Sequence, residues 1–227
     1  MKKSLENYYV LGLMSGTSMD GIDTSIVKTN GVTLIRKNLQ HIEKYSQNTL
    51  KLLSKALANP KDFINNHNEK KNLSYLITID HFNAIKTLLK KTDILPNLIG
   101  FHGQTIYHNP QEKLSVQLGN PNLLAKLTNI DVISDFRQND ILHGGQGAPL
   151  APVYHQNIIE NMSLPTPCCF VNIGGVSNVT YYDNKVLIAF DTGPGNCLMD
   201  TLIKEHTNYD YDKNGNIASR GVVNQEI

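Results

Sequence analysis

Two short apolar stretches near the start of the chain flank a bend that is rich in glycine and serine. Residues 8–14 predict a buried strand, and Ile22, Ser25 and Val27 predict that a second strand follows the bend. The two strands are therefore expected to form a hairpin. Residues 32–39 predict a third strand directly after it.

The apolar spacing then changes to that of amphipathic helices. Ser46 can cap a helix that carries Leu50 and Leu53 on one side, and a second helical pattern runs through residues 73–89. Residues 97–101 predict a buried strand that leads into a polar turn at residues 102–105. Strands that alternate with helices favour a layered α/β fold.

The second half of the chain repeats this alternation with shorter elements. Asn120 and Pro121 predict the cap and first turn of a helix, and residues 132–133 predict another strand. A helical stretch at residues 154–160 precedes the proline-containing residues 162–167, which we take as the junction between domains. The expected strands and helix beyond the junction are residues 168–173, 179–182 and 186–190, with a helix near Leu198.

We therefore divide the chain into residues 1–165 and residues 166–227. The second part has only about sixty residues, which is few for an independent hydrophobic core, so we expect an incomplete second domain. The formal net charge is +1 and 18% of the residues are charged, which gives no general attraction to nucleic acid or to a membrane surface. Three cysteines without disulfide or metal spacing, and no signal peptide or membrane segment, lead us to expect a cytoplasmic protein that binds a small molecule.

The bend at residues 12–23 is the first candidate for chemistry. Glycines let the backbone N–H groups approach an anion, Thr17 and Ser18 add hydroxyl donors, and Asp20 or Asp23 could hold a magnesium ion. The bend therefore predicts binding of a nucleotide phosphate. The alternative is an ordinary turn, because such residues are common in turns.

Other glycine-rich turns follow predicted strands at residues 102–105, 144–147 and 191–196. A further turn at residues 172–178 resembles the first bend, so the two hairpins could hold a triphosphate from opposite sides. Strand-end loops are where α/β folds place ligands. Alternatively, these turns only connect short strands.

Asp191 is the candidate general base, because it follows an apolar run and precedes a glycine-rich turn, where partial desolvation would raise its pKa. The alternative is an aspartate that caps the following helix. Asp135 and Asp140 flank Arg137 and are rival carboxylates, with an ion pair as the ordinary interpretation. The sequence contains no Walker, Rossmann, zinc-protease or serine-hydrolase motif.

His102 and His108 lack a third metal ligand at a suitable spacing, so we interpret them as hydrogen-bonding residues. The amides of Gln104, Asn120, Gln146 and Asn178 can both donate and accept hydrogen bonds, as a polyhydroxylated ligand requires.

Seven strings in order resemble the anhydro-N-acetylmuramic acid kinase family; they are residues 12–23, 101–106, 116–121, 135–137, 144–150, 172–178 and 190–196. The resemblance implies an actin-like ATPase fold of the ribonuclease H-like α/β type, with two lobes that close on ATP and Mg²⁺. It also implies that Asp191 is the catalytic base. Of the two carboxylates of the bend, we assign the metal to Asp20. The implied ATP-binding residues are Gly16, Thr17, Ser18, Met19, Asp20, Gly21, Ile22, Asp23, Asn172, Gly174, Gly175, Ser177 and Asn178. The implied sugar-binding residues are His102, Gln104, Thr105, Asp135, Arg137 and Gln146.

The activity implied by this resemblance is the hydrolytic opening of 1,6-anhydro-N-acetylmuramic acid and its phosphorylation by ATP to N-acetylmuramate 6-phosphate, a step of cell-wall sugar recycling. The family continues past this chain with the rest of the second lobe, including an adenosine-contacting segment, so we expect a C-terminally truncated chain. The alternative function is a non-catalytic sugar-binding remnant of such a kinase. Two partner hypotheses stay open, namely a second copy of the chain or a separately encoded C-terminal part.

Overall fold

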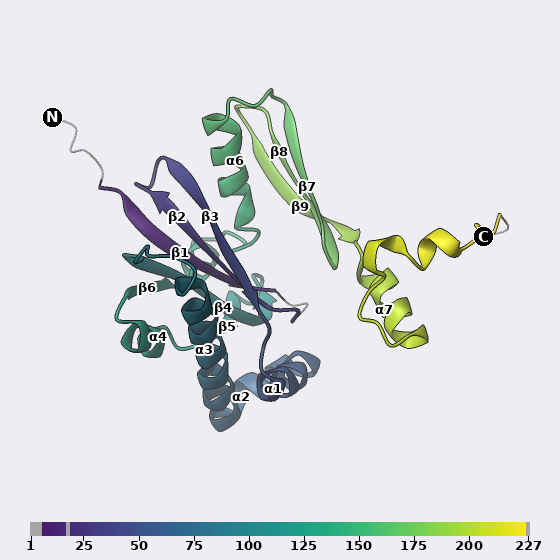
Figure 1. Cartoon of the computed structure of the whole chain (residues 1–227), viewed down its shortest axis with the longest axis horizontal. Coiled ribbons are helices and arrows are strands. Elements are labelled where there is room, and N and C mark those ends of the chain that lie inside the picture. Colours follow the sequence, from purple (N-terminus) through teal and green to yellow (C-terminus); the bar gives the residue numbers. More distant parts are fainter. Residues whose placement is uncertain (1–5, 17–18, 226–227) are drawn as a thin grey trace. The chain divides into compact units, whose positions relative to one another are not determined.

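The computed structural model describes residues 6–16 and 19–225 (Figure 1). The chain divides into two compact units, Met1–Ala148 and Pro149–Ile227. The division falls before the helix at Ala151–Asn161, whereas the sequence placed the junction after this helix. No helix within the described residues is long and apolar enough to cross a membrane.

The first unit is built on a six-stranded mixed sheet. Its strands are β1 (Tyr8–Ser15), β2 (Ile22–Thr29), β3 (Leu34–Glu43), β4 (Leu98–Asn109), β5 (Leu114–Leu118) and β6 (Asp131–Ser134). The order is β3-β2-β1-β4-β5, and β6 pairs with β4. The antiparallel β1–β2 pair confirms the predicted hairpin, with Ser15 opposite Ile22 next to the bend.

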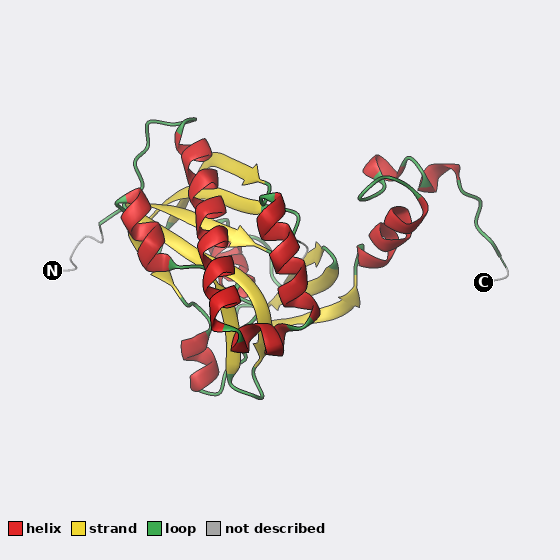
Figure 2. Cartoon of the chain, turned by 90° about the horizontal axis from the view of Figure 1, so that it is seen from below, coloured by secondary structure: helices red, strands yellow, loops and turns green. Residues whose placement is uncertain are grey.

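The helices of the first unit lie against its sheet (Figure 2). They are α1 (Gln47–Ala58), α2 (Pro60–Asn65), α3 (His67–Leu89), α4 (Pro121–Thr128) and α5 (Gln138–Leu142). The predicted cap at Ser46 is confirmed, because its side chain accepts from the backbone N–H of Thr49. The predicted cap at Asn120 is confirmed in the same way, through the N–H of Leu123.

The core of the first unit lies between the long helix α3 and the sheet. Leu11, Ile26 and Ile99 from the strands and Leu53 and Ile85 from the helices are each at most 1% exposed. Burial of this many large side chains removes a large apolar area from water, which stabilises the sheet at about 25 cal/mol for each Å². The core therefore holds the ends of β1 and β4, where the candidate site lies, in fixed positions.

The second unit is a three-stranded antiparallel sheet with one covering helix. Its strands are β7 (Cys168–Ile173), β8 (Val176–Tyr182) and β9 (Leu187–Pro194), and its helices are α6 (Ala151–Asn161) and α7 (Cys197–His206). Two short 3-10 turns follow at Lys213–Gly215 and Ala218–Arg220. On the face covered by α6, His155 stacks on Phe170 with ring centroids 4.5 Å apart, and Tyr182 donates a hydrogen bond to Glu160.

Candidate functional site

The long strand β4 changes its neighbour halfway along its length. Residues 98–101 pair in parallel with β6, and from Gln104 onward the same edge pairs in antiparallel fashion with β5. The expected turn at residues 102–105 is therefore wrong, because these residues continue the strand and carry out this change of neighbour. Gly103 permits it with a φ of +71°, and a Cβ atom there would collide with the carbonyl of Leu118.

A cavity of about 330 Å³ opens where β6 and β5 diverge on either side of this point. It is lined by Lys70, Phe101, His102, Gly103, Ser115, Val116, Gln117, Leu118, Gly119, Pro121, Ser134, Asp135 and Gln138. A change of strand neighbours leaves such an opening at the ends of the diverging strands, which is where α/β sheets bind ligands. Gly119 keeps the wall open, since a Cβ atom there would meet the ring of Phe101.

His102 is a buried wall residue with both ring nitrogens bonded. Its Nδ1 lies 2.8 Å from the carbonyl oxygen of Gly103, and its Nε2 lies 2.9 Å from Nε of Arg137. An arginine can only donate, so Nε2 accepts and the proton is on Nδ1. Burial lowers the pKa of His102, and the charge of Arg137 lowers it further. His102 is therefore a neutral imidazole that holds the guanidinium in place.

Arg137 connects this histidine to the loop at residues 143–149. Its Nη1 donates to the carbonyl of Gly147 at 2.7 Å, and the N–H of Gly147 donates to the carboxylate of Asp140 at 2.7 Å. Among the described residues neither Asp135 nor Asp140 forms an ion pair with Arg137, so the ion-pair interpretation is wrong. Asp135 instead lines the cavity with a φ of +62°.

Gln104 does not line the cavity, because its side chain lies in the core at 0% exposure. Its amide nitrogen donates to the carbonyl of Gly16 at 3.0 Å and to that of Thr105 at 3.3 Å, and its amide oxygen accepts from the hydroxyl of Tyr45 at 3.1 Å. The side chain thus connects β4 to the end of β1. Within the cavity wall, Gln117 donates to the hydroxyl of Thr105 at 3.2 Å.

The predicted phosphate-binding bend lies directly after β1. Met19 donates from its backbone N–H to the carbonyl of Gly16 at 3.2 Å and has a φ of +57°. Ile22 is fully buried in the core, so only its backbone could face a ligand. Thr17 and Ser18, both predicted phosphate ligands, lie outside the described residues.

Two carboxylates, Asp20 and Asp23, lie beside this bend. The pKa of Asp23 is raised, first by partial burial and then by the negative charge of Asp20. Two acidic groups that repel each other are stabilised by a divalent cation, and Mg²⁺ is usually held by one or two carboxylates together with substrate phosphates. Asp20 and Asp23 fit such an ion.

In the second unit the structure brings the two predicted motifs together. Asp191 lies within β9 and pairs in register with Asn178 of β8, so the expected turn beginning at this residue is wrong. The backbone N–H groups of Gly195 and Asn196 donate to the carbonyls of Gly175 and Gly174 at 2.9 and 2.8 Å. The hairpin at residues 172–178 is thereby fixed against the residues that precede α7.

Asp191 is exposed, and it is not a helix cap, since Asn196 occupies the N-cap position of α7. The expected partial desolvation of this carboxylate is therefore not present, because β9 is an edge strand of a sheet that is covered on one face. Gln146 is also exposed and does not line the cavity of the first unit.

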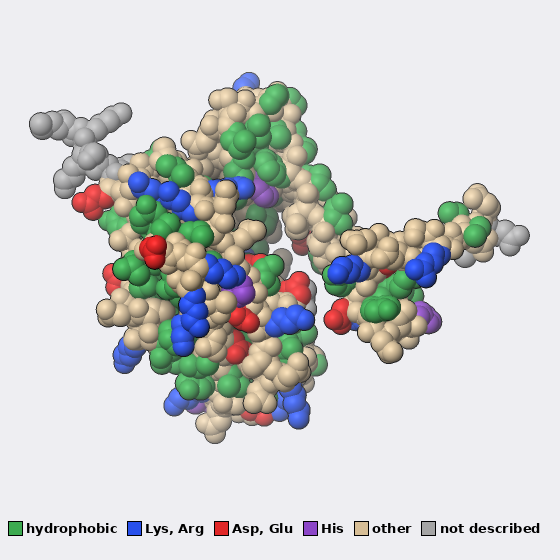
Figure 3. All heavy atoms as spheres, in the orientation of Figure 1, with side chains coloured by type: hydrophobic (Ala, Val, Ile, Leu, Met, Phe, Trp, Pro, Cys, Tyr) green, Lys and Arg blue, Asp and Glu red, His purple; other side chains and the backbone are tan. Residues whose placement is uncertain are grey.

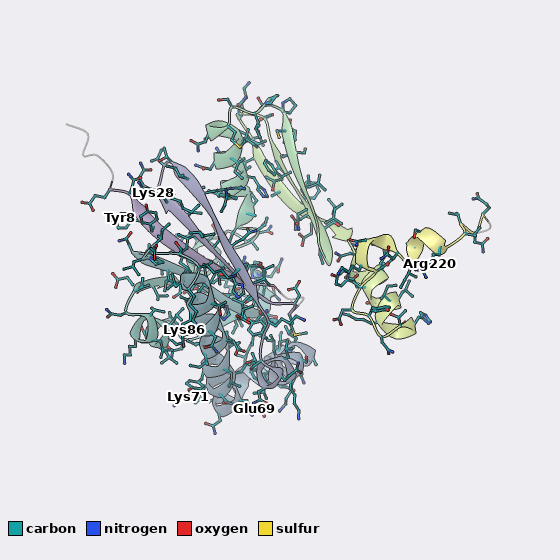
Figure 4. The ribbon with its side chains drawn as sticks, in the orientation of Figure 1. Tyr8, Lys28, Glu69, Lys71, Lys86 and Arg220 are labelled. Carbon is teal, nitrogen blue, oxygen red and sulfur yellow. The ribbon has the colours of Figure 1, made fainter. Side chains whose placement is uncertain are left out.

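The sequence reasoning missed several polar residues of the cavity wall, namely Lys70, Ser115, Gln117, Ser134 and Gln138. Ser134 and Gln138 flank the Asp135-Phe136-Arg137 string, so their position beside this motif could have identified them as candidate site residues. Lys70 had no such signal, because it lies in a polar stretch that forms the first turn of α3. Its sequence neighbours Glu69 and Lys71 are labelled on this helix in Figure 4.

Comparison with known proteins agrees with the motifs. A family model described as "Anhydro-N-acetylmuramic acid kinase" matches residues 8–227. The chain is 41% identical to a protein of that name from Pelagibacter ubique over 98% of this chain and 61% of the relative. It is 43% identical to one from Agrobacterium fabrum over 94% of this chain and 60% of the relative. A relative of the same name from Rhodopseudomonas palustris is 40% identical over 95% of this chain and 60% of its own length.

The chain thus spans about 60% of the length of the curated relatives that it matches. The match includes the cavity wall, the β1–β2 bend and the β7–β8 hairpin, since all three lie within residues 8–227. The chain belongs to the anhydro-N-acetylmuramic acid kinase family.

Proposed function

We propose that this chain provides the sugar-binding and phosphate-binding residues of an ATP-dependent kinase that acts on 1,6-anhydro-N-acetylmuramic acid. The observation that carries the proposal is the cavity at the β4 change of neighbour, lined by His102 and Asp135, in a chain of this family. A cavity of about 330 Å³ has the size of a small polar ligand. Its serine, amide, carboxylate and imidazole groups supply the donors and acceptors that sugar hydroxyls require.

The bend after β1 would bind the phosphates of ATP. Its glycine backbone can approach an anion closely, and Gly16 is already held by Met19 and Gln104. Asp20 and Asp23 would hold Mg²⁺, which supplies charge neutralisation for the phosphates when it is bound. In the second unit, the turn at Gly174 and Gly175 would be a further phosphate-binding hairpin of a two-lobe, actin-like fold.

Asp191 would act as the general base of the reaction. It would take a proton from the water molecule that attacks the anomeric carbon, while the bond from that carbon to O6 breaks. The freed O6 would take the γ-phosphoryl group of ATP, which leaves ADP and N-acetylmuramate 6-phosphate. Loss of a general base costs about 10²–10⁴-fold in rate, and the side chain of Asp191 is exposed, so water can reach it.

Calorimetry of the purified chain with the anhydro sugar and with ATP tests binding. An assay of sugar-dependent ADP formation, with the part of the relatives that this chain does not span supplied as a second chain, tests turnover. We expect both ligands to bind and Asp191→Asn to abolish turnover while sugar binding is retained. Asp210→Asn changes another exposed aspartate of the same unit and serves as the matched control. Full turnover by Asp191→Asn would remove the assignment of the base. Sugar binding without any ATP binding would instead favour the non-catalytic alternative.

A further inference from the structure

We propose that Gln104 is a positioning residue that fixes the backbone of the nucleotide-binding bend at Gly16. This inference rests on the proposed function, because the bend is assigned to ATP only there. It adds a role that the cavity does not show, since Gln104 lies in the core and cannot contact a ligand.

The Gln104 side chain is fully buried. A buried amide is costly unless both of its polar ends are bonded, and a leucine or methionine would fill the same space without this cost. Both ends of Gln104 are bonded, the oxygen to Tyr45 at 3.1 Å and the nitrogen to Gly16 at 3.0 Å. Glutamine is suited to the position because it can accept from the hydroxyl and donate to the carbonyl at once.

The strand register changes next to Gln104. The parallel pairing of β1 with β4 shifts between Leu13 and Ser15, so the regular ladder ends just before the bend. Beyond this point two side-chain hydrogen bonds connect the end of β1 to β4. Ser15 donates from its hydroxyl to the carbonyl of Gly103 at 3.2 Å, and Gln104 donates to Gly16. The side chains thus replace ladder bonds at the place where the backbone leaves the sheet.

The Gly16 carbonyl is held by two donors. Gly16 accepts from both Gln104 and the backbone N–H of Met19, at 3.0 and 3.2 Å. Two donors on one carbonyl fix the direction in which the backbone of Gly16 leaves β1. Anion-binding turns depend on such orientation, since their N–H groups must all be aimed at the ligand. Gln104 would therefore pre-organise the bend for phosphate.

The test compares Gln104→Met, which removes all three amide hydrogen bonds, with Tyr45→Phe, which removes the hydroxyl that bonds Gln104 and Ser15 but leaves the Gln104 bond to Gly16. Hydrogen exchange at the amide of Met19, measured without ligand, reports the bend directly. We expect about tenfold faster exchange in Gln104→Met, the change that corresponds to loss of one buried hydrogen bond. In Tyr45→Phe the exchange rate of this amide should stay within about twofold of the unsubstituted chain, because the donor to Gly16 remains.

The affinity for ligands gives a second and separate readout. Gln104→Met should weaken ATP binding about tenfold and leave sugar affinity unchanged, because the His102 and Arg137 bonds do not use the Gln104 side chain. Gln104→Leu also removes the donor to Gly16 and has a side chain of similar size. It should reproduce the same pattern if Gln104→Met does not fold.

Unchanged exchange at Met19 in both Gln104 variants, or equal acceleration in Tyr45→Phe, would overturn the positioning role. Failure of the unsubstituted chain to bind ATP would count against the proposed function, whereas the exchange experiment would still decide the role of Gln104.

Discussion

The two units of this chain differ most in how much of each is buried. In the first unit, strands and helices share a continuous core that contains Leu11, Ile26 and Ile99. In the described part of the second unit, the buried residues are Pro152, Ile159, Thr180 and Tyr182. The second unit therefore depends on a few contacts between α6 and one face of its sheet. Figure 3 shows hydrophobic side chains gathered over the part of the second unit at the top of the picture.

The opposite face of the second sheet carries apolar side chains that stay exposed. Val171, Ile173, Ile188 and Phe190 are 66%, 69%, 46% and 53% exposed. The candidate residues of the two units are therefore held in place to different degrees. His102 and Gln104 are held by a closed core, whereas Asp191 lies on a strand that is covered on one face only.

The largest expected difference between the units is the cost of removing an apolar side chain. Ile99→Ala removes a fully buried side chain from β4 and should lower the free energy of unfolding of the first unit by about 3 to 4 kcal/mol. Phe190→Ala removes a larger but half-exposed side chain and should cost less than about 1.5 kcal/mol. Hydrogen exchange resolved by segment measures both. A larger loss from Phe190→Ala would contradict the contrast.

A second expected difference is the pH dependence of stability. Burial lowers the pKa of His81 in α3 to about 4, from a model-peptide value of 6.5. The unfolded chain therefore takes up this proton first as pH falls from about 6.5 toward 4, so the stability of the first unit should fall in this window by up to about 3 kcal/mol. Urea unfolding at pH 7.5 and pH 4.5 measures the change.

His81→Phe is the control for this pH effect, because it keeps an aromatic ring beside Tyr45 and Phe101 and cannot titrate. If the unfolding free energy of this variant falls just as steeply with pH, another group is responsible.

The smallest expected effect is a difference in solvent access between two neighbouring cysteines of β7. Cys168 and Cys169 are neighbours in β7, but successive side chains of a strand point to opposite faces. Cys169 is exposed and Cys168 is half-buried. A neutral thiol reagent should label Cys169 several-fold faster, with Cys168→Ala and Cys169→Ala as paired controls. Equal labelling would mean that the two faces of this sheet are equally accessible.

The elements of the fold could be predicted to a large extent from the sequence. The β1–β2 hairpin, the caps at Ser46 and Asn120 and the strand at Cys168–Ile173 were all readable, because local spacing and capping chemistry determine them. The helix α2 was missed, because its six residues are too few to show a helical period.

The sequence by itself determined which strings carry polar chemistry at the ends of strands. Only the tertiary structure decided which of those residues face a cavity, and it placed His102 and Asp135 on the wall but Gln104 in the core. The physical reason is that β4 exchanges β6 for β5 as its neighbour at Gly103, and such pairings between distant segments leave no periodic signal in the local sequence.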